Sequence, residues 1–253
     1  DKISFGAAIA EGQVMGVIRI LLNPTGKACA ANAVLQCLAW LMLLADGYVF
    51  DLWNGGFILM RSLVHNSAIP LDLMTFGPFE WLLTGDWSIE KFLQRQQDAC
   101  EFCSYILNFT RPGFLDCSWV TRPAFIDGLL AHQLDGEKGT AFTPISLPFT
   151  NLSSDTCELQ QLILCWYDPS GLCRAATQDG CQLVLELNRH RDDDHTKLTQ
   201  LVHFQHDISF PFFCNSDGEI NMERFVICGV VYHLGANPST GHWRAALKYQ
   251  GQI

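Results

Sequence analysis

The strongest constraint on the fold is an apolar segment that follows a turn of small residues. Residues 28–45 are almost wholly apolar, and the polar exceptions Asn32 and Gln36 are four positions apart. That spacing puts both amides on one face of a helix. The segment has the length of a membrane span, but its amides and its lack of a basic flank favour a globular interior. We therefore predict a buried helix over residues 28–45, and no membrane partner.

Cys29 stands at the start of this predicted helix, three residues after Gly26. The first N–H groups of a helix have no intrahelical partner, and the helix dipole is positive there, so both stabilise a thiolate. A histidine that can accept the thiol proton, His242, lies far along the chain after a strand-like apolar run. A cysteine and a histidine distant in sequence are typical of papain-type thiol hydrolases.

Composition limits the partners and the compartment. With 253 residues, 49% of them hydrophobic, the chain can form one large domain or two small ones. A net charge of −10 argues against a nucleic-acid partner and favours a basic one. The eleven cysteines form no framework of short loops, and no secretory start precedes them. We therefore expect a reducing, intracellular location, cytoplasmic or nuclear.

Four segments, in order, resemble the boxes of the ubiquitin-specific proteases. They are a cysteine box over 26–36, a glutamine–aspartate box over 96–102, a leucine-rich strand with a basic corner over 183–198, and a histidine box over 233–243. The match extends over about residues 20–249. It implies an α+β, papain-like cysteine protease fold as a single catalytic domain over 1–253. The helical thumb would cover about 24–110, reduced fingers about 111–182, and the β-sheet palm about 183–253 plus the N-terminal strand.

Alternation of residue types predicts further elements. A strand is expected near Leu183–Leu187, and another over 226–232 with an interruption at Cys228-Gly229. The segment 145–149 followed by 159–163 resembles the family's strand and short helix after the fingers. Because proline cannot donate to a sheet ladder, Pro211 is expected in an edge strand or at a strand end.

The resemblance implies hydrolysis of the bond at the C-terminal glycine of ubiquitin through an acyl-enzyme on Cys29, with His242 moving the proton. Ubiquitin or a ubiquitinated protein would be the partner. The amide of Cys29 is one oxyanion donor. Relatives add an asparagine five positions before the cysteine, where this chain has Pro24, so the neighbouring Asn23 is the candidate. The third triad residue is either absent or follows Ile253.

Three residues of the glutamine–aspartate box are candidates for binding the arginine-bearing tail of ubiquitin: Gln97, Asp98 and Glu101. A helix is predicted over 88–107 with Ser88 as its N-cap. Asp98 and Glu101 would then share a face. An exposed acidic face is the ordinary interpretation of such a pair. The resemblance favours a substrate groove instead.

No metal and no cofactor are predicted. Cysteines recur every eight residues through the expected fingers, but single cysteines at that spacing lack the paired knuckles of a zinc site. These are Cys157, Cys165, Cys173 and Cys181. The helical pair Cys100 and Cys103 is assigned to packing.

Two functions stay open at this point. The first is an active deubiquitinase. The second is a catalytically impaired module that binds ubiquitin or another protein without turnover, since Ala30, Trp243 and Ala246 replace aromatic or tyrosine positions of the family. A general papain-like peptidase would not explain the glutamine–aspartate box.

Overall fold

The computed structural model describes residues 18–44, 57–64, 69–123, 137–149, 155–168, 172–177, 182–189, 197–214, 219–237 and 240–248. They form a mixed α and β fold, as expected. The chain divides into two compact units: the first unit is Asp1–Phe114 with Cys228–Ile253, and the second unit is Leu115–Ile227. That both work as one catalytic domain stays a prediction.

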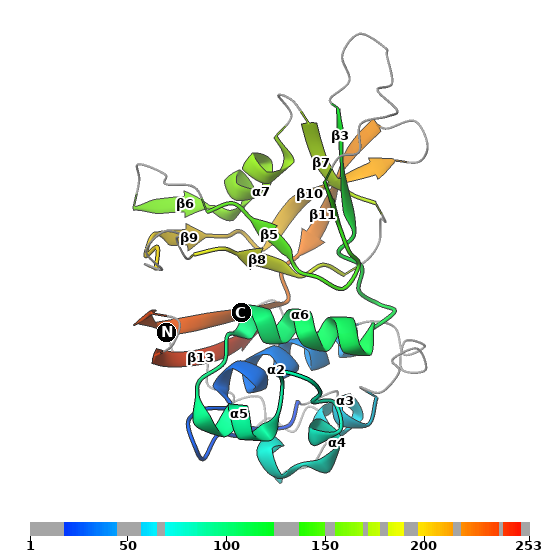
Figure 1. The fold of residues 1–253 in the computed structure, drawn as a ribbon. Coiled ribbons are helices and arrows are strands. Elements are labelled where there is room, and N and C mark those ends of the chain that lie inside the picture. The colour runs from blue at the N-terminus through cyan, green and yellow to red at the C-terminus, as the bar shows by residue number, and fades with distance from the viewer. Residues whose placement is uncertain are drawn as a thin grey trace. The chain divides into compact units, whose positions relative to one another are not determined.

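The first unit contains most of the helices (Figure 1). Its helices are α2 (Cys29–Leu44), α3 (Phe57–Val64), η2 (Leu73–Thr75, a 3-10 helix), α4 (Gly77–Glu80), α5 (Ile89–Gln94) and α6 (Ala99–Thr110). Its strands are β1 (Leu21–Leu22), β2 (Leu71–Asp72), β12 (Gly229–Asn237) and β13 (Thr240–Leu247). β1 and β2 pair in parallel, and β12 and β13 form an antiparallel hairpin.

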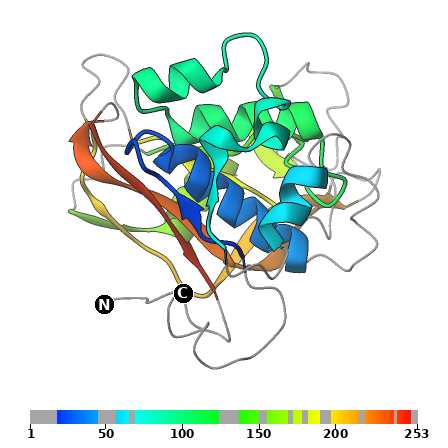
Figure 2. The same ribbon diagram turned by 90° about the horizontal axis from the view of Figure 1, so that it is seen from below.

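Helix α2 is the centre of the first unit, which confirms the predicted buried helix. Ten of its 16 residues are buried, most of them small or aliphatic. It packs against α3, α6 and both strands of the hairpin; Figure 2 shows the blue α2 beside the orange and red β12 and β13. The Asn32 Nδ2 donates to the Leu22 carbonyl at 3.0 Å and so ties β1 to the helix. Among the described helices, none is long and apolar enough to cross a bilayer.

An aromatic cluster holds α4, α5 and α6 together. Phe79, Phe92 and Phe102 are fully buried, with ring centroids 5.7 Å apart for Phe79 and Phe92 and for Phe92 and Phe102. Trp87 packs edge-on against Phe102 at 5.4 Å. Because α5 and α6 each contribute a ring, the cluster fixes the ends of the connecting segment 95–98.

The helix predicted over 88–107 is two helices. The Ser88 side chain accepts from the Lys91 N–H, which confirms it as an N-cap. The helix then stops at Gln94, since Arg95 is extended, and α6 begins at Ala99. The prediction of one continuous helix was wrong because Asp98 caps a new helix instead of continuing the first.

The second unit is built mainly of strands (Figure 1). A five-stranded sheet has the order β11-β10-β7-β3-β4. Its strands are β3 (Trp119–Pro123), β4 (Lys138–Gly139), β7 (Leu172–Ala176), β10 (Asp207–Cys214) and β11 (Glu219–Val226). The other elements are β5 (Ile145–Leu147), β6 (Thr156–Glu158), α7 (Leu159–Tyr167), β8 (Leu185–Leu187) and β9 (Leu201–His203). The expected strand and helix after residue 145, the strand near 185 and the break at Cys228 are confirmed.

Pro211 departs from expectation. It is buried in the middle of β10, which lies between β11 and β7. Pro211 is in register with Met222 on β11, whereas pairing with β7 is limited to Phe212 opposite Ala176. The prediction of an edge or strand end was therefore wrong, because pairing with β7 covers too little of β10 to require an N–H from the proline.

We predict that Phe102→Ala destabilises the first unit by about 3–5 kcal/mol, because it opens a cavity among fully buried rings. Phe109→Ala is the control, since Phe109 on the same helix is 41% exposed. It should change the unfolding free energy by less than about 1 kcal/mol. Urea unfolding followed by tryptophan fluorescence gives both values, and equal effects would contradict the role of the cluster.

Candidate active site

A tight turn delivers Cys29 to the first position of α2. The Gly26 N–H donates to the Asn23 carbonyl at 3.1 Å, and Pro24 occupies the second position of this turn, where a fixed φ is favourable. Gly26 has φ +72°, a conformation that glycine adopts without strain. The Asn23 Oδ1 accepts from the Ala28 N–H at 3.0 Å. Asn23 thus holds the backbone in front of the cysteine, and its oxyanion role stays a prediction.

The thiol of Cys29 meets an amide from another segment. Cys29 is only 2% exposed, and its Sγ accepts a hydrogen bond of 2.9 Å from the Nε2 of Gln96. The same nitrogen donates to the Gly241 carbonyl, also at 2.9 Å. Two successive hydrogen bonds of about 3 Å put the thiol sulfur within about 6 Å of that carbonyl oxygen. The cysteine, glutamine–aspartate and histidine boxes therefore meet within the first unit.

The hairpin separates its two histidines. A Cβ on Gly241 (φ +136°) would lie 2.2 Å from the Leu234 carbonyl oxygen and 2.7 Å from the His233 Nε2, so only glycine fits. The His233 ring also packs on Trp243, with centroids 4.7 Å apart. His242 is exposed and lies directly after Gly241. Within the described residues no hydrogen bond joins His242 to the Cys29 thiol, and their pairing stays a prediction.

Asp98 has a structural task that the sequence did not reveal. Its Oδ1 accepts from the N–H groups of Cys100 (2.7 Å) and Glu101 (3.0 Å), which makes it the N-cap of α6. The expectation that Asp98 and Glu101 share a helix face was wrong, because Asp98 precedes the helix. Both bonds use Oδ1, and among the described residues Oδ2 has no hydrogen-bond partner. Glu101 is exposed.

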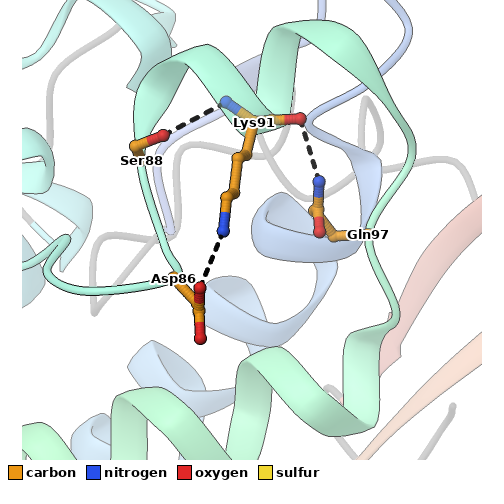
Figure 3. Close-up of polar contacts among 4 residues, drawn as sticks. All are labelled: Asp86, Ser88, Lys91 and Gln97. Atoms are coloured by element: carbon orange, nitrogen blue, oxygen red, sulfur yellow. Dashed lines mark hydrogen bonds and ion pairs between the residues drawn. The ribbon is translucent and has the colours of Figure 1, made fainter.

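Gln97 supports the end of α5. Its side chain is buried, and its Nε2 donates to the carbonyls of Lys91 and Arg95, each at 3.0 Å (Figure 3). Figure 3 also shows Lys91 held by an ion pair with Asp86 at 3.1 Å and by the Ser88 cap. The Gln97 amide nitrogen is thus engaged within the protein, and its predicted contact with a substrate tail stays untested.

Gln96 is the site residue that sequence reasoning missed. It opens the glutamine–aspartate box, but attention went to the residues that helical spacing placed on one face. Since residues 95–98 are not helical, that spacing gave the wrong side-chain directions. The position of Gln96 at the head of the box was the available signal.

A second cysteine of α2, Cys37, has different chemistry. Burial, with a smaller contribution from neighbouring Cys228, raises the pKa of the Cys37 thiol to about 12. A thiol with such a pKa is almost wholly protonated at neutral pH and is a poor nucleophile.

Other candidate ligand sites lie apart from these residues. A cavity of about 390 Å³ is lined by second-unit residues, including Trp119, Arg174 and Asn188, and contains neither Cys29 nor His242. Among the described residues, no three histidine, cysteine or acidic side chains form a group that could hold a metal. Cys181 lies outside the described residues, so the absence of zinc stays a prediction.

The comparisons give a structural likeness without a sequence match. No family model and no curated protein match this chain. A chain of the SAGA Ubp8/Sgf11/Sus1/Sgf73 DUB module bound to ubiquitin aldehyde superposes with a TM-score of 0.62 at 16% identity. The alignment covers 98% of this chain and 67% of that one. A Ubp8 variant of the same module gives 0.62 at 15% identity, covering 98% and 65%. The fold of this chain is thus similar to that of a module containing a ubiquitin-specific protease.

Proposed function

We propose that this chain is a thiol-dependent deubiquitinase that hydrolyses the isopeptide or peptide bond at the ubiquitin C-terminal glycine. One observation carries the proposal: the Gln96 amide joins the Cys29 thiol to the Gly241 carbonyl, next to His242. Three sequence boxes of the family thereby meet at a helix N-terminus, where a thiolate is stabilised.

In the proposed reaction His242 accepts the thiol proton and the Cys29 sulfur attacks the glycine carbonyl carbon. The C=O electron pair moves to oxygen, which the Cys29 N–H stabilises. As this intermediate collapses, the C–N bond breaks and the lysine amine leaves with the proton from His242. Water, deprotonated by His242, then hydrolyses the thioester and restores the thiol.

Three further findings support this assignment. The matched DUB module was solved with ubiquitin aldehyde, and we extend that partner, ubiquitin or a ubiquitinated protein, to this chain as part of the proposal. The net charge of −10 suits a basic substrate tail. All nine described cysteines are free thiols, consistent with a reducing cytoplasmic or nuclear location.

A specific observation favours the second candidate, a module that binds ubiquitin without turnover. Cys29 is 2% exposed, and within the described part of the chain its thiol is bonded to Gln96 and not to His242. An active enzyme must open this site for a carbonyl group, whereas a binding module need not.

We predict that a ubiquitin with a C-terminal propargylamide forms one covalent adduct with the chain, and that Cys29→Ala abolishes it. Only a thiol beside the bound tail reacts with this probe, so Cys37→Ala is the matched control and should react like wild type. Intact mass spectrometry gives the result. Binding of unmodified ubiquitin without an adduct would select the impaired module, and loss of both would refute either function.

We predict that iodoacetamide at about pH 8 labels Cys37 at least 100-fold more slowly than the exposed Cys165. Because the pKa of Cys37 is raised to about 12, the thiolate is scarce below that pH, and labelling should rise about tenfold per pH unit between about pH 7 and 10. Peptide mass spectrometry follows both sites. A pH-independent rate at Cys37 would contradict the prediction.

We predict that Asp98→Asn raises KM for a ubiquitin C-terminal amide substrate about tenfold at low salt and less at high salt. Asparagine caps a helix as well as aspartate does, so this change removes the charge and keeps the helix. Asp98→Ala removes both and should also lower stability by about 1 kcal/mol. If Asp98→Asn leaves KM unchanged while Asp98→Ala is impaired, Asp98 serves only as a cap.

A further inference from the structure

The Gln96 side chain touches the nucleophile but has no part in the reaction proposed for Cys29 and His242. Its Nε2 lies 2.9 Å from the Cys29 Sγ and 2.9 Å from the Gly241 carbonyl oxygen. A carbonyl oxygen can only accept, so the end of the amide facing Gly241 must be its NH₂ group. The second hydrogen of that nitrogen is then available to the sulfur. The Gly241 contact therefore fixes Gln96 as a donor toward the reacting atom.

We propose that Gln96 is a catalytic residue that donates to the oxyanion formed at Cys29, a role that rests on the proposed acyl transfer. When Sγ bonds to a carbonyl carbon, the carbonyl oxygen lies about 3 Å from the sulfur, in the range where the Gln96 donor is held. The C=O electron pair moves onto that oxygen, which becomes a far better acceptor than the sulfur. The Gln96 N–H shifts from Sγ to the oxyanion, and returns to sulfur when the acyl group leaves.

The loop before Cys29 makes such a donor necessary. Pro24 stands where the resembled family has its oxyanion asparagine, and proline offers neither a side-chain donor nor a backbone N–H. Asn23 directs its Oδ1 at the Ala28 N–H, which commits its side chain to the turn. The Cys29 N–H alone would then stabilise the oxyanion. Gln96 supplies the second donor from the opposite segment of the site.

The Gly241 bond also makes the donor preorganised. A donor held in place before the reaction stabilises charge without a reorganisation cost at the moment of reaction. The carbonyl that holds Gln96 belongs to a residue whose conformation is restricted to glycine by the His233 ring and the Leu234 carbonyl. The packed His233 therefore acts on the site through the backbone, without meeting the thiol.

The test compares two small reagents at Cys29 that do not require ubiquitin. p-Nitrophenyl acetate acylates the thiol through an oxyanion, whereas iodoacetamide alkylates it at a saturated carbon and forms none. Both rates are measured on the Cys29 peptide by mass spectrometry in wild type, Gln96→Ala and Gln96→Glu. Gln94→Ala is the control, because the Gln94 amide bonds only to the surface carboxylate of Glu90 among the described residues.

We expect acetylation to fall at least tenfold in both Gln96 variants while alkylation stays within threefold or rises, and no change in Gln94→Ala. The ratio of the two rates is independent of the folded fraction, so partial misfolding does not obscure it. With a ubiquitin C-terminal amide substrate, kcat should fall by about 10²–10³ with KM nearly constant. Equal loss of acetylation and alkylation would show that Gln96 only positions the thiol, and an unchanged ratio would overturn the proposal. A wild type that is acetylated but does not cleave ubiquitin refutes the proposed function alone.

Discussion

Burial of helix α2 is the constraint on which the rest of the first unit depends. The helix contacts α3, α6 and the β12–β13 hairpin, so one apolar segment joins the N-terminal helices to strands about 200 residues later. Its small first-turn residues, Ala28, Ala30 and Ala31, are fully buried and leave room for neighbouring segments to approach the start of the helix. At about 25 cal/mol per Å² of apolar surface, such burial outweighs any single polar contact in the site. The position of Cys29 is therefore a result of packing.

Polar contacts then set the direction of the side chains. The Asn23 and Asn32 amides hold the turn and β1 against α2, and the Gln96 amide connects the thiol to the hairpin. Each such bond contributes about 1 kcal/mol net, which is small beside the core but sufficient to select one rotamer. The box around Gln97 and Asp98 is similar: one side chain closes α5 and the other opens α6. Residues that resemble substrate contacts thus also build the short segment that carries Gln96.

A thiol that is 2% exposed has a clear consequence for function. Substrate must displace the groups that cover the sulfur, and the Gln96 amide is one of them. Exchange of a thiol for an oxyanion as the acceptor of the same N–H requires only a small movement of that side chain. In this way the contact that covers the resting thiol can become the contact that stabilises the reacting carbonyl.

The sequence alone determined the elements that depend on local pattern. The apolar segment predicted α2, Ser88 predicted a helix start, and four ordered boxes predicted a mixed fold with Cys29 at a helix N-terminus. Only the tertiary structure decided the break between α5 and α6, the interior place of Pro211 and the meeting of Gln96 with Cys29 and Gly241. The physical reason is distance along the chain: helix periodicity and capping act over a few residues, whereas Gln96 lies 67 residues from Cys29 and 145 from Gly241. Contacts over such separations follow from how α2 packs, which no local pattern encodes.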